Sequence, residues 1–131
     1  MNRMEIRSRV RAIMSAKVDE YGMVSPVEVL IDLGYLSKDD YENWRFGRVQ
    51  YLEKVCKVNL SKLSTIMKEI RTATSDHSLT ASWTDYRKWG KGVRIRLCFS
   101  KSVIEPIERA YATHYISHAV LTRIKEQAAS M

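Results

Sequence analysis

Glycine, proline and cysteine are scarce in this chain, and long apolar runs are missing. Its 131 residues include 5 Gly, 2 Pro and 2 Cys. So few Gly and Pro residues exclude collagen-like and extended low-complexity structure. No apolar run approaches the roughly 18 residues of a membrane-spanning helix. Residues 1–7 are basic but no apolar segment follows them, so we expect no secretory signal, no membrane partner and a cytoplasmic protein.

The two cysteines, Cys56 and Cys98, lie far apart in the sequence. Both fall in apolar-patterned segments, so we interpret them as small buried hydrophobic residues in a reducing compartment. A disulfide between them is the alternative, which the sequence leaves open. A Cys-x-x-Cys pair is missing, and with it the commonest zinc and redox spacings.

Recognisable catalytic and metal-binding motifs are also missing. The chain has no P-loop, no G-x-G-x-x-G and no G-x-S-x-G. His114 and His118 lie four residues apart and could share a helix face as metal ligands, but no third ligand is spaced to join them. We therefore interpret both as surface or half-buried, and we predict a non-enzymatic protein without cofactors. A catalytic site assembled from distant residues around His114, His118 or Tyr111 is the alternative.

Apolar residues recur at helical spacing along most of the chain, and capping signals divide them into helices. Ser25, Ser37 and Asn59 are N-cap candidates, and Gly22 is a C-terminal stop. The predicted helices cover residues 2–20, 25–34, 37–47, 49–57, 59–71 and 82–89, with two more inside residues 104–128. Residues 72–80, which include His77, are predicted to form a polar loop.

The helix that starts at Asn59 has the clearest apolar face. Its apolar residues recur at spacings of one, three and four, and they are Leu60, Leu63, Ile66, Met67 and Ile70. Polar residues fill the opposite face. We expect this helix to be the central element of the core.

Residues 93–99 follow a different period. The apolar residues Val93, Ile95, Leu97 and Phe99 alternate with Arg94, Arg96 and Cys98. A period of two predicts a strand with one buried face, so Arg94 and Arg96 should point away from the core. Because a lone strand leaves its backbone groups unpaired, its partner must be another short strand or a second chain.

These patterns predict a mainly α fold: a compact multi-helix domain with one short β element near residues 93–99. A length of 131 residues favours a single domain, which spans residues 1–131. Within it, residues 1–22 are predicted to form an N-terminal helix.

The net charge of +7 is concentrated in two segments. Residues 1–17 hold five basic residues and one acid, whereas residues 83–101 hold six and one. The second segment interleaves cations with aromatic residues, namely Trp83, Tyr86, Arg87, Lys88, Trp89, Lys91, Arg94 and Arg96. Cations neutralise phosphates and release counterions, and exposed aromatic rings stack on unpaired bases.

A purely structural interpretation of residues 83–101 stays open. Trp83, Tyr86 and Trp89 are three residues apart, a spacing more typical of core packing than of a stacking platform. Basic residues most often form a solvated face. A smaller cluster of the same kind contains Arg45 and Arg48, which the dipole at a helix C-terminus favours without any ligand.

The helices that start at Pro26 and Lys38 have the lengths of a helix-turn-helix motif. In that motif, the start of the second helix enters the major groove of DNA. Here that start carries Asp39, Asp40 and Glu42, whose charge phosphates would repel. An ordinary helical hairpin is therefore the favoured interpretation.

Five segments carry a resemblance to a known family: residues 34–37 (GYLS), 40–49 (DYENWRFGRV), 58–63 (VNLSKL), 89–92 (WGKG) and 110–115 (AYATHY). Between about Ser25 and Ile116, the chain resembles a small bacterial protein family to which we can attach no activity. The resemblance implies a bacterial, cytosolic, single-domain protein whose family-like core is residues 25–116. Because residues 1–22 lie outside that core, we expect the N-terminal helix to act as an accessory or oligomerisation arm. It supplies no catalytic residue.

The sequence therefore predicts a nucleic-acid-binding module as the first hypothesis. The residues expected to contact nucleic acid are Arg45, Arg48, Arg87, Lys88, Trp89, Lys91, Arg94 and Arg96. Their pairing with acids, or their scattering over opposite faces, would count against this hypothesis. The alternative is a protein-interaction or adaptor domain that self-associates through its N-terminal helix and could form a homodimer.

Overall fold

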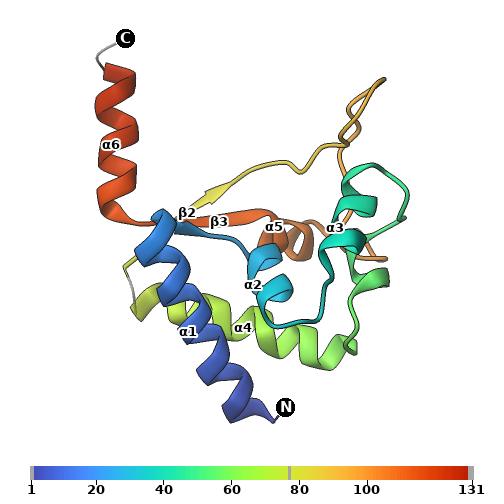
Figure 1. Cartoon of the computed structure of the whole chain (residues 1–131), viewed down its shortest axis with the longest axis horizontal. Helices are drawn as coiled ribbons and strands as arrows, with labels where there is room; N and C mark the ends of the chain where they lie inside the picture. The colour runs from blue at the N-terminus through green and yellow to red at the C-terminus, as the bar shows by residue number, and fades with distance from the viewer. Residues whose placement is uncertain (1, 77, 130–131) are drawn as a thin grey trace.

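The computed structural model describes residues 2–76 and 78–129, so the predicted loop position of His77 lies outside the described residues (Figure 1). The elements follow in the order α1 (Arg3–Tyr21), β1 (Met23–Val24), α2 (Pro26–Asp32), α3 (Lys38–Arg45), η1 (Leu52–Val55), α4 (Leu60–Asp76), β2 (Thr80–Trp83), α5 (Glu105–Ala112), β3 (Thr113–Ile116) and α6 (His118–Ala129). The fold is mainly α and compact, as predicted.

The predicted capping residues begin their helices. Each side-chain oxygen accepts a hydrogen bond from the backbone amide three residues later, at 3.3 Å for Ser25, 3.0 Å for Ser37 and 2.8 Å for Asn59. Gly22 ends α1 in the left-handed conformation, with φ of 73°. These contacts satisfy backbone groups that a helix end leaves unpaired.

Helices α1 and α4 lie side by side and supply much of the core (Figure 1). The buried apolar residues are Ile6, Val10 and Met14 of α1 and Leu63, Ile66 and Ile70 of α4. Leu60, expected on the same face, is 66% exposed because it is the first residue of α4 and lines an open cavity. The apolar stripe of α1 is therefore used within the chain, and self-association through this helix stays a prediction.

Three short strands form an antiparallel sheet in the order β1-β3-β2. Tyr115 of the central strand lies opposite Val24 on one side and Ala81 on the other. The sequence pattern predicts no strand at any of these positions. Strands of two to four residues are too short to show alternation, and β3 follows α5 directly, without a Gly or Pro between them.

The strand predicted over residues 93–99 is wrong as a regular strand: among the described residues, this segment forms one isolated antiparallel bridge, between Arg96 and Arg87, which joins it to residues 86–88. Leu97 N donates to Tyr86 O at 2.8 Å, and Lys88 N donates to Ile95 O at 2.9 Å. The chain turns between them at Gly90 and Gly92, whose φ angles of 98° and 96° suit glycine. We call residues 86–97 the hairpin arm.

The hairpin arm corrects two predictions. The helix predicted at residues 82–89 is wrong, because the backbone groups of residues 86–88 bond across the hairpin. The buried face predicted for residues 93–99 holds only in part. Leu97 and Phe99 are buried, whereas Val93 and Ile95, nearer the tip, are 80% and 53% exposed.

Other helix boundaries also differ from the prediction. In place of a helix over residues 49–57 there is the short 3-10 helix η1, whose first amides donate to Cys98 O and Phe99 O at 3.1 and 2.9 Å. Residues 72–76, predicted as loop, continue α4 because Ala73 is fully buried. Cys56 is buried, Cys98 is partly buried, and both are free thiols.

Helix α6 has no buried residue and projects from the body of the molecule (Figure 1). Its first residue is His118, whereas His114 lies in β3, so the two histidines do not share a helix face. Among the described residues, no helix is both long enough and apolar enough to span a membrane.

Candidate nucleic-acid interface

Two hydrogen bonds attach the hairpin arm, and the residue directly after it, to the C-terminal end of α3. Trp89 N donates to Arg45 O at 2.7 Å, and the indole Nε1 of fully buried Trp44 donates to Cys98 O at 2.8 Å. The first bond holds the arm at Trp89, and the second holds the chain at Cys98, directly after the arm.

Stacked and tilted aromatic rings fill the space under the hairpin arm. Trp44 lies 5.6 Å from Tyr86 and 5.0 Å from Phe99, measured between ring centroids, and Phe99 stacks on Tyr111 at 5.3 Å. Such pairs add to the stabilisation from apolar burial. Burial raises the pKa of Tyr86 to about 12, so its hydroxyl is neutral where it bonds His114 Nε2 at 2.9 Å.

Core packing is the interpretation that the sequence favours for both tryptophans, and it is wrong. Trp83 and Trp89 are 42% and 38% exposed, and only the residue between them in the pattern, Tyr86, is buried. The reason is the hairpin: Trp83 ends β2, and Trp89 lies against the end of α3. A three-residue spacing places side chains on one face only if the segment is helical.

Arg45 links the buried rings to the surface. Its guanidinium lies over the ring of Tyr86 at 4.9 Å and over the ring of Trp89 at 4.6 Å. Cation–π contacts of this kind hold a guanidinium in place without neutralising its charge. The neighbouring Arg48 lies over Phe46 at 5.1 Å and donates to Asn43 Oδ1 at 3.1 Å.

Two of the predicted binding residues are paired with acids. Arg87 contacts the Asp85 carboxylate at 2.8 Å. Arg96 lies 3.5 Å from the same carboxylate and 3.4 Å from Glu105. These ion pairs lie at the base of the hairpin arm and count against a part for Arg87 and Arg96 in nucleic-acid binding, which stays a prediction.

Trp83 forms a second aromatic contact with arginines, which the sequence did not reveal. The guanidinium groups of Arg96 and Arg109 lie 5.5 and 5.3 Å from the centroid of its ring. Arg109 belongs to α5, so this contact ties the base of the hairpin arm to that helix. Helical spacing in residues 104–128 gave no sign of it.

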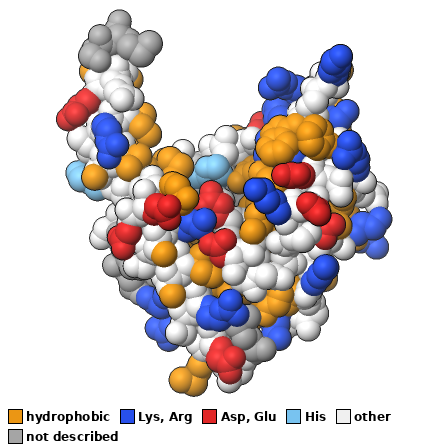
Figure 2. All heavy atoms as spheres, in the orientation of Figure 1, with side chains coloured by type: hydrophobic (Ala, Val, Ile, Leu, Met, Phe, Trp, Pro, Cys, Tyr) orange, Lys and Arg blue, Asp and Glu red, His pale blue; other side chains and the backbone are white. Residues whose placement is uncertain are grey.

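Lys88, Lys91 and Arg94 are the uncompensated cations of the hairpin arm. Lys91 and Arg94 are exposed, and Lys88 is half-buried with its stem against Gly47. In the described part of the chain, none of the three forms an ion pair with an acid. Figure 2 shows Lys and Arg side chains gathered over the hairpin arm and the neighbouring end of α3.

No protein-family model, curated protein or solved structure matches this chain. The resemblance to a bacterial family therefore stays a prediction. The candidate interface rests on the geometry of the hairpin arm alone.

Proposed function

We propose that this chain binds nucleic acid through the cationic tip of the hairpin arm. The observation that carries the proposal is the placement of Lys88, Lys91 and Arg94 on one projecting hairpin, with no acid paired to them among the described residues. Cations in this arrangement meet a phosphate backbone without first breaking an internal ion pair. Each phosphate contact releases condensed counterions, which favours binding.

The anchoring of the arm supports this proposal. The Trp89 N bond fixes the arm, the Trp44 Nε1 bond fixes the chain directly after it, and Asp85 braces the base through Arg87 and Arg96. Cations on a fixed scaffold lose less conformational entropy on binding than cations on a free loop. The proposal therefore assigns separate roles to the base of the arm and to its tip.

Trp89, Arg45 and Arg48 lie beside this tip and extend the proposed surface. Trp89 is 38% exposed, but the Arg45 guanidinium lies over its ring. Stacking of a base would compete with that contact, so we assign Arg45 a phosphate contact and Trp89 a supporting role. The cytoplasmic location predicted from the sequence would place this surface among nucleic acids.

The exposed apolar residues of the arm favour a second candidate, a protein-interaction module. Val93 and Ile95 are 80% and 53% exposed at the same tip as the cations. Exposed apolar side chains that lie close together are found at protein interfaces. Such a partner would bind with little salt dependence, whereas phosphate binding weakens steeply as salt rises.

The test is fluorescence anisotropy with labelled single- and double-stranded DNA and RNA, at low and high salt. The proposal expects binding that weakens with salt, and its abolition in the variant Lys88→Glu, Lys91→Glu, Arg94→Glu. A matched control, Lys68→Glu, Arg123→Glu, Lys125→Glu, makes the same change in net charge on α4 and α6. Equal weakening in the two variants, or no binding at low salt, would reject the hairpin arm as the interface.

A further inference from the structure

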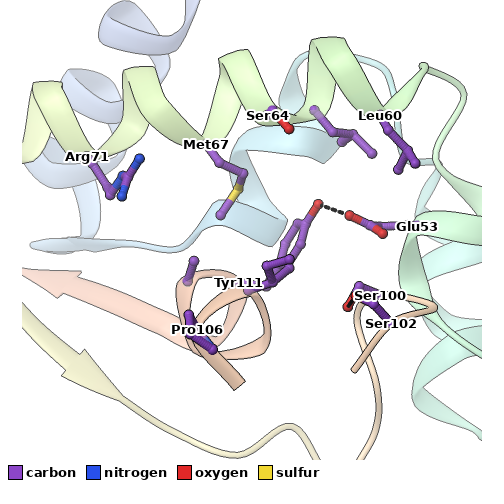
Figure 3. Close-up of a pocket in the computed structure, with 12 residues that line it drawn as sticks. Glu53, Leu60, Ser64, Met67, Arg71, Ser100, Ser102, Pro106 and Tyr111 are labelled. Atoms are coloured by element: carbon purple, nitrogen blue, oxygen red, sulfur yellow. Dashed lines mark hydrogen bonds between the residues drawn. The ribbon is translucent and has the colours of Figure 1, made fainter. Parts of the chain in front are cut away.

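A cavity of about 440 Å³ lies between α4 and α5, on a different part of the molecule from the tip of the hairpin arm (Figure 3). Its walls include Leu60 and Met67 of α4 and Ile107 of α5, and Glu53 of η1 closes one end. Leu60 and Ile107 are 66% and 39% exposed, so the cavity leaves apolar surface in contact with solvent. Of its lining residues, only Tyr111 belongs to a site considered from the sequence.

A hydrogen bond from the Tyr111 side chain holds the Glu53 carboxylate at the end of this cavity. The buried Tyr111 hydroxyl donates to Glu53 Oε2 at 2.6 Å, and Figure 3 shows the two groups pointing toward one another. Burial and the neighbouring carboxylate raise the pKa of Tyr111, so the hydroxyl keeps its proton and remains the donor. The bond fixes where the carboxylate points without neutralising its charge.

A second carboxylate nearby, that of Glu108, accepts more hydrogen bonds than the Glu53 carboxylate does. Buried Glu108 accepts hydrogen bonds from Phe99 N at 2.8 Å, from Ser100 N at 2.9 Å and from Ser100 Oγ at 2.8 Å. Among the described residues, Glu53 has one side-chain donor and forms no ion pair with a Lys or Arg. Because an ionised carboxylate has about four acceptor positions, Glu53 retains capacity for a ligand.

We propose that this cavity binds a primary amine with a short apolar chain, with its ammonium group against Glu53. An ammonium group supplies three donors and a compensating charge to the carboxylate. The apolar chain lies between Leu60, Met67 and Ile107 and removes their surface from water. Arg71 lines the other end of the cavity and repels a second cation, so monoamines bind in preference to diamines.

The test is a titration of the protein with ¹³C-labelled methionine methyl groups, followed by NMR at the Met67 resonance. Hexylamine, hexanol, hexanoate and 1,6-diaminohexane serve as probes of equal chain length. We expect a saturable shift with hexylamine and a dissociation constant at least about tenfold weaker for each of the other three. Hexanol or hexanoate binding as tightly as hexylamine, or no saturable shift with any probe, would overturn the proposal.

Two variants test whether the ammonium group of the amine contacts the Glu53 carboxylate. Glu53→Gln should weaken hexylamine binding by about tenfold or more, whereas the control Glu126→Gln on the projecting α6 should leave it unchanged. Leu60→Lys, at an exposed position on the cavity wall, places a cation beside Glu53 and should also block the amine. If Leu60→Lys folds and binds hexylamine as the natural chain does, the proposed contact is wrong, whatever the stability of Glu53→Gln.

Discussion

At the scale of single residues, Arg45 and Glu108 show how charge is placed in this molecule. Arg45 keeps its charge while two aromatic rings hold its guanidinium in position. Buried Glu108 of α5 accepts three hydrogen bonds from residues 99 and 100. These bonds fix the chain that follows the hairpin arm to α5. Neither contact follows from sequence spacing, because each joins residues from separate elements.

His114 provides a pH test at this scale. Burial lowers its pKa from 6.5, so the folded state disfavours its protonation, while the unfolded state takes up the proton at its ordinary pKa. The free energy of unfolding should therefore fall as pH drops below 6.5 toward the folded-state pKa. Urea unfolding at pH 7 and pH 5.5 measures this decrease.

The matched pair for that measurement is His114→Gln and His118→Gln. His114→Gln should remove much of the decrease in stability below pH 6.5, because the group that titrates is gone. His118 is exposed at the start of α6, so His118→Gln should keep the pH dependence of the natural chain. An unchanged pH dependence in His114→Gln would contradict the assignment.

At the scale of elements, local signals predicted helix starts well and the hairpin arm poorly. Ser25, Ser37 and Asn59 act through amides three residues away, so a short stretch of sequence contains the whole contact. Residues 86–88 instead bond to residues 95–97, and the arm is held by α3. The two glycines at positions 90 and 92 suit a turn, but nothing local indicated which segment would return to meet residues 93–99.

An alanine substitution at Gly22 tests whether the end of α1 packs against α6. It has φ of +73°, and a Cβ built on it would overlap the side chain of Val120 in α6. Gly34 has a similar φ of +86°, with no atom within 4 Å of such a Cβ. Gly34→Ala should therefore cost about 1 kcal/mol from backbone strain alone, and Gly22→Ala about 2 kcal/mol or more. Equal costs in urea unfolding would show that α6 does not pack against Gly22.

At the scale of the whole molecule, the basic charge divides into paired and unpaired groups. The sequence showed that basic charge is concentrated in residues 83–101, and it supplied eight candidate binding residues, whose role stays a prediction. It did not predict that Arg87 and Arg96 would pair with Asp85, because that depends on how the hairpin folds back. Lys88, Lys91 and Arg94 therefore carry the central claim of phosphate binding.

The most direct test of that claim is to measure how nucleic-acid affinity depends on salt in two variants that each replace two cations with glutamine. Lys91→Gln, Arg94→Gln removes the tip cations, and Lys68→Gln, Arg123→Gln is its control away from the hairpin arm. The slope of log K against log salt should decrease in magnitude by about one for each phosphate-binding cation that the first variant removes, and stay unchanged in the control. The same slope in the natural chain and both variants would contradict phosphate binding by the hairpin arm.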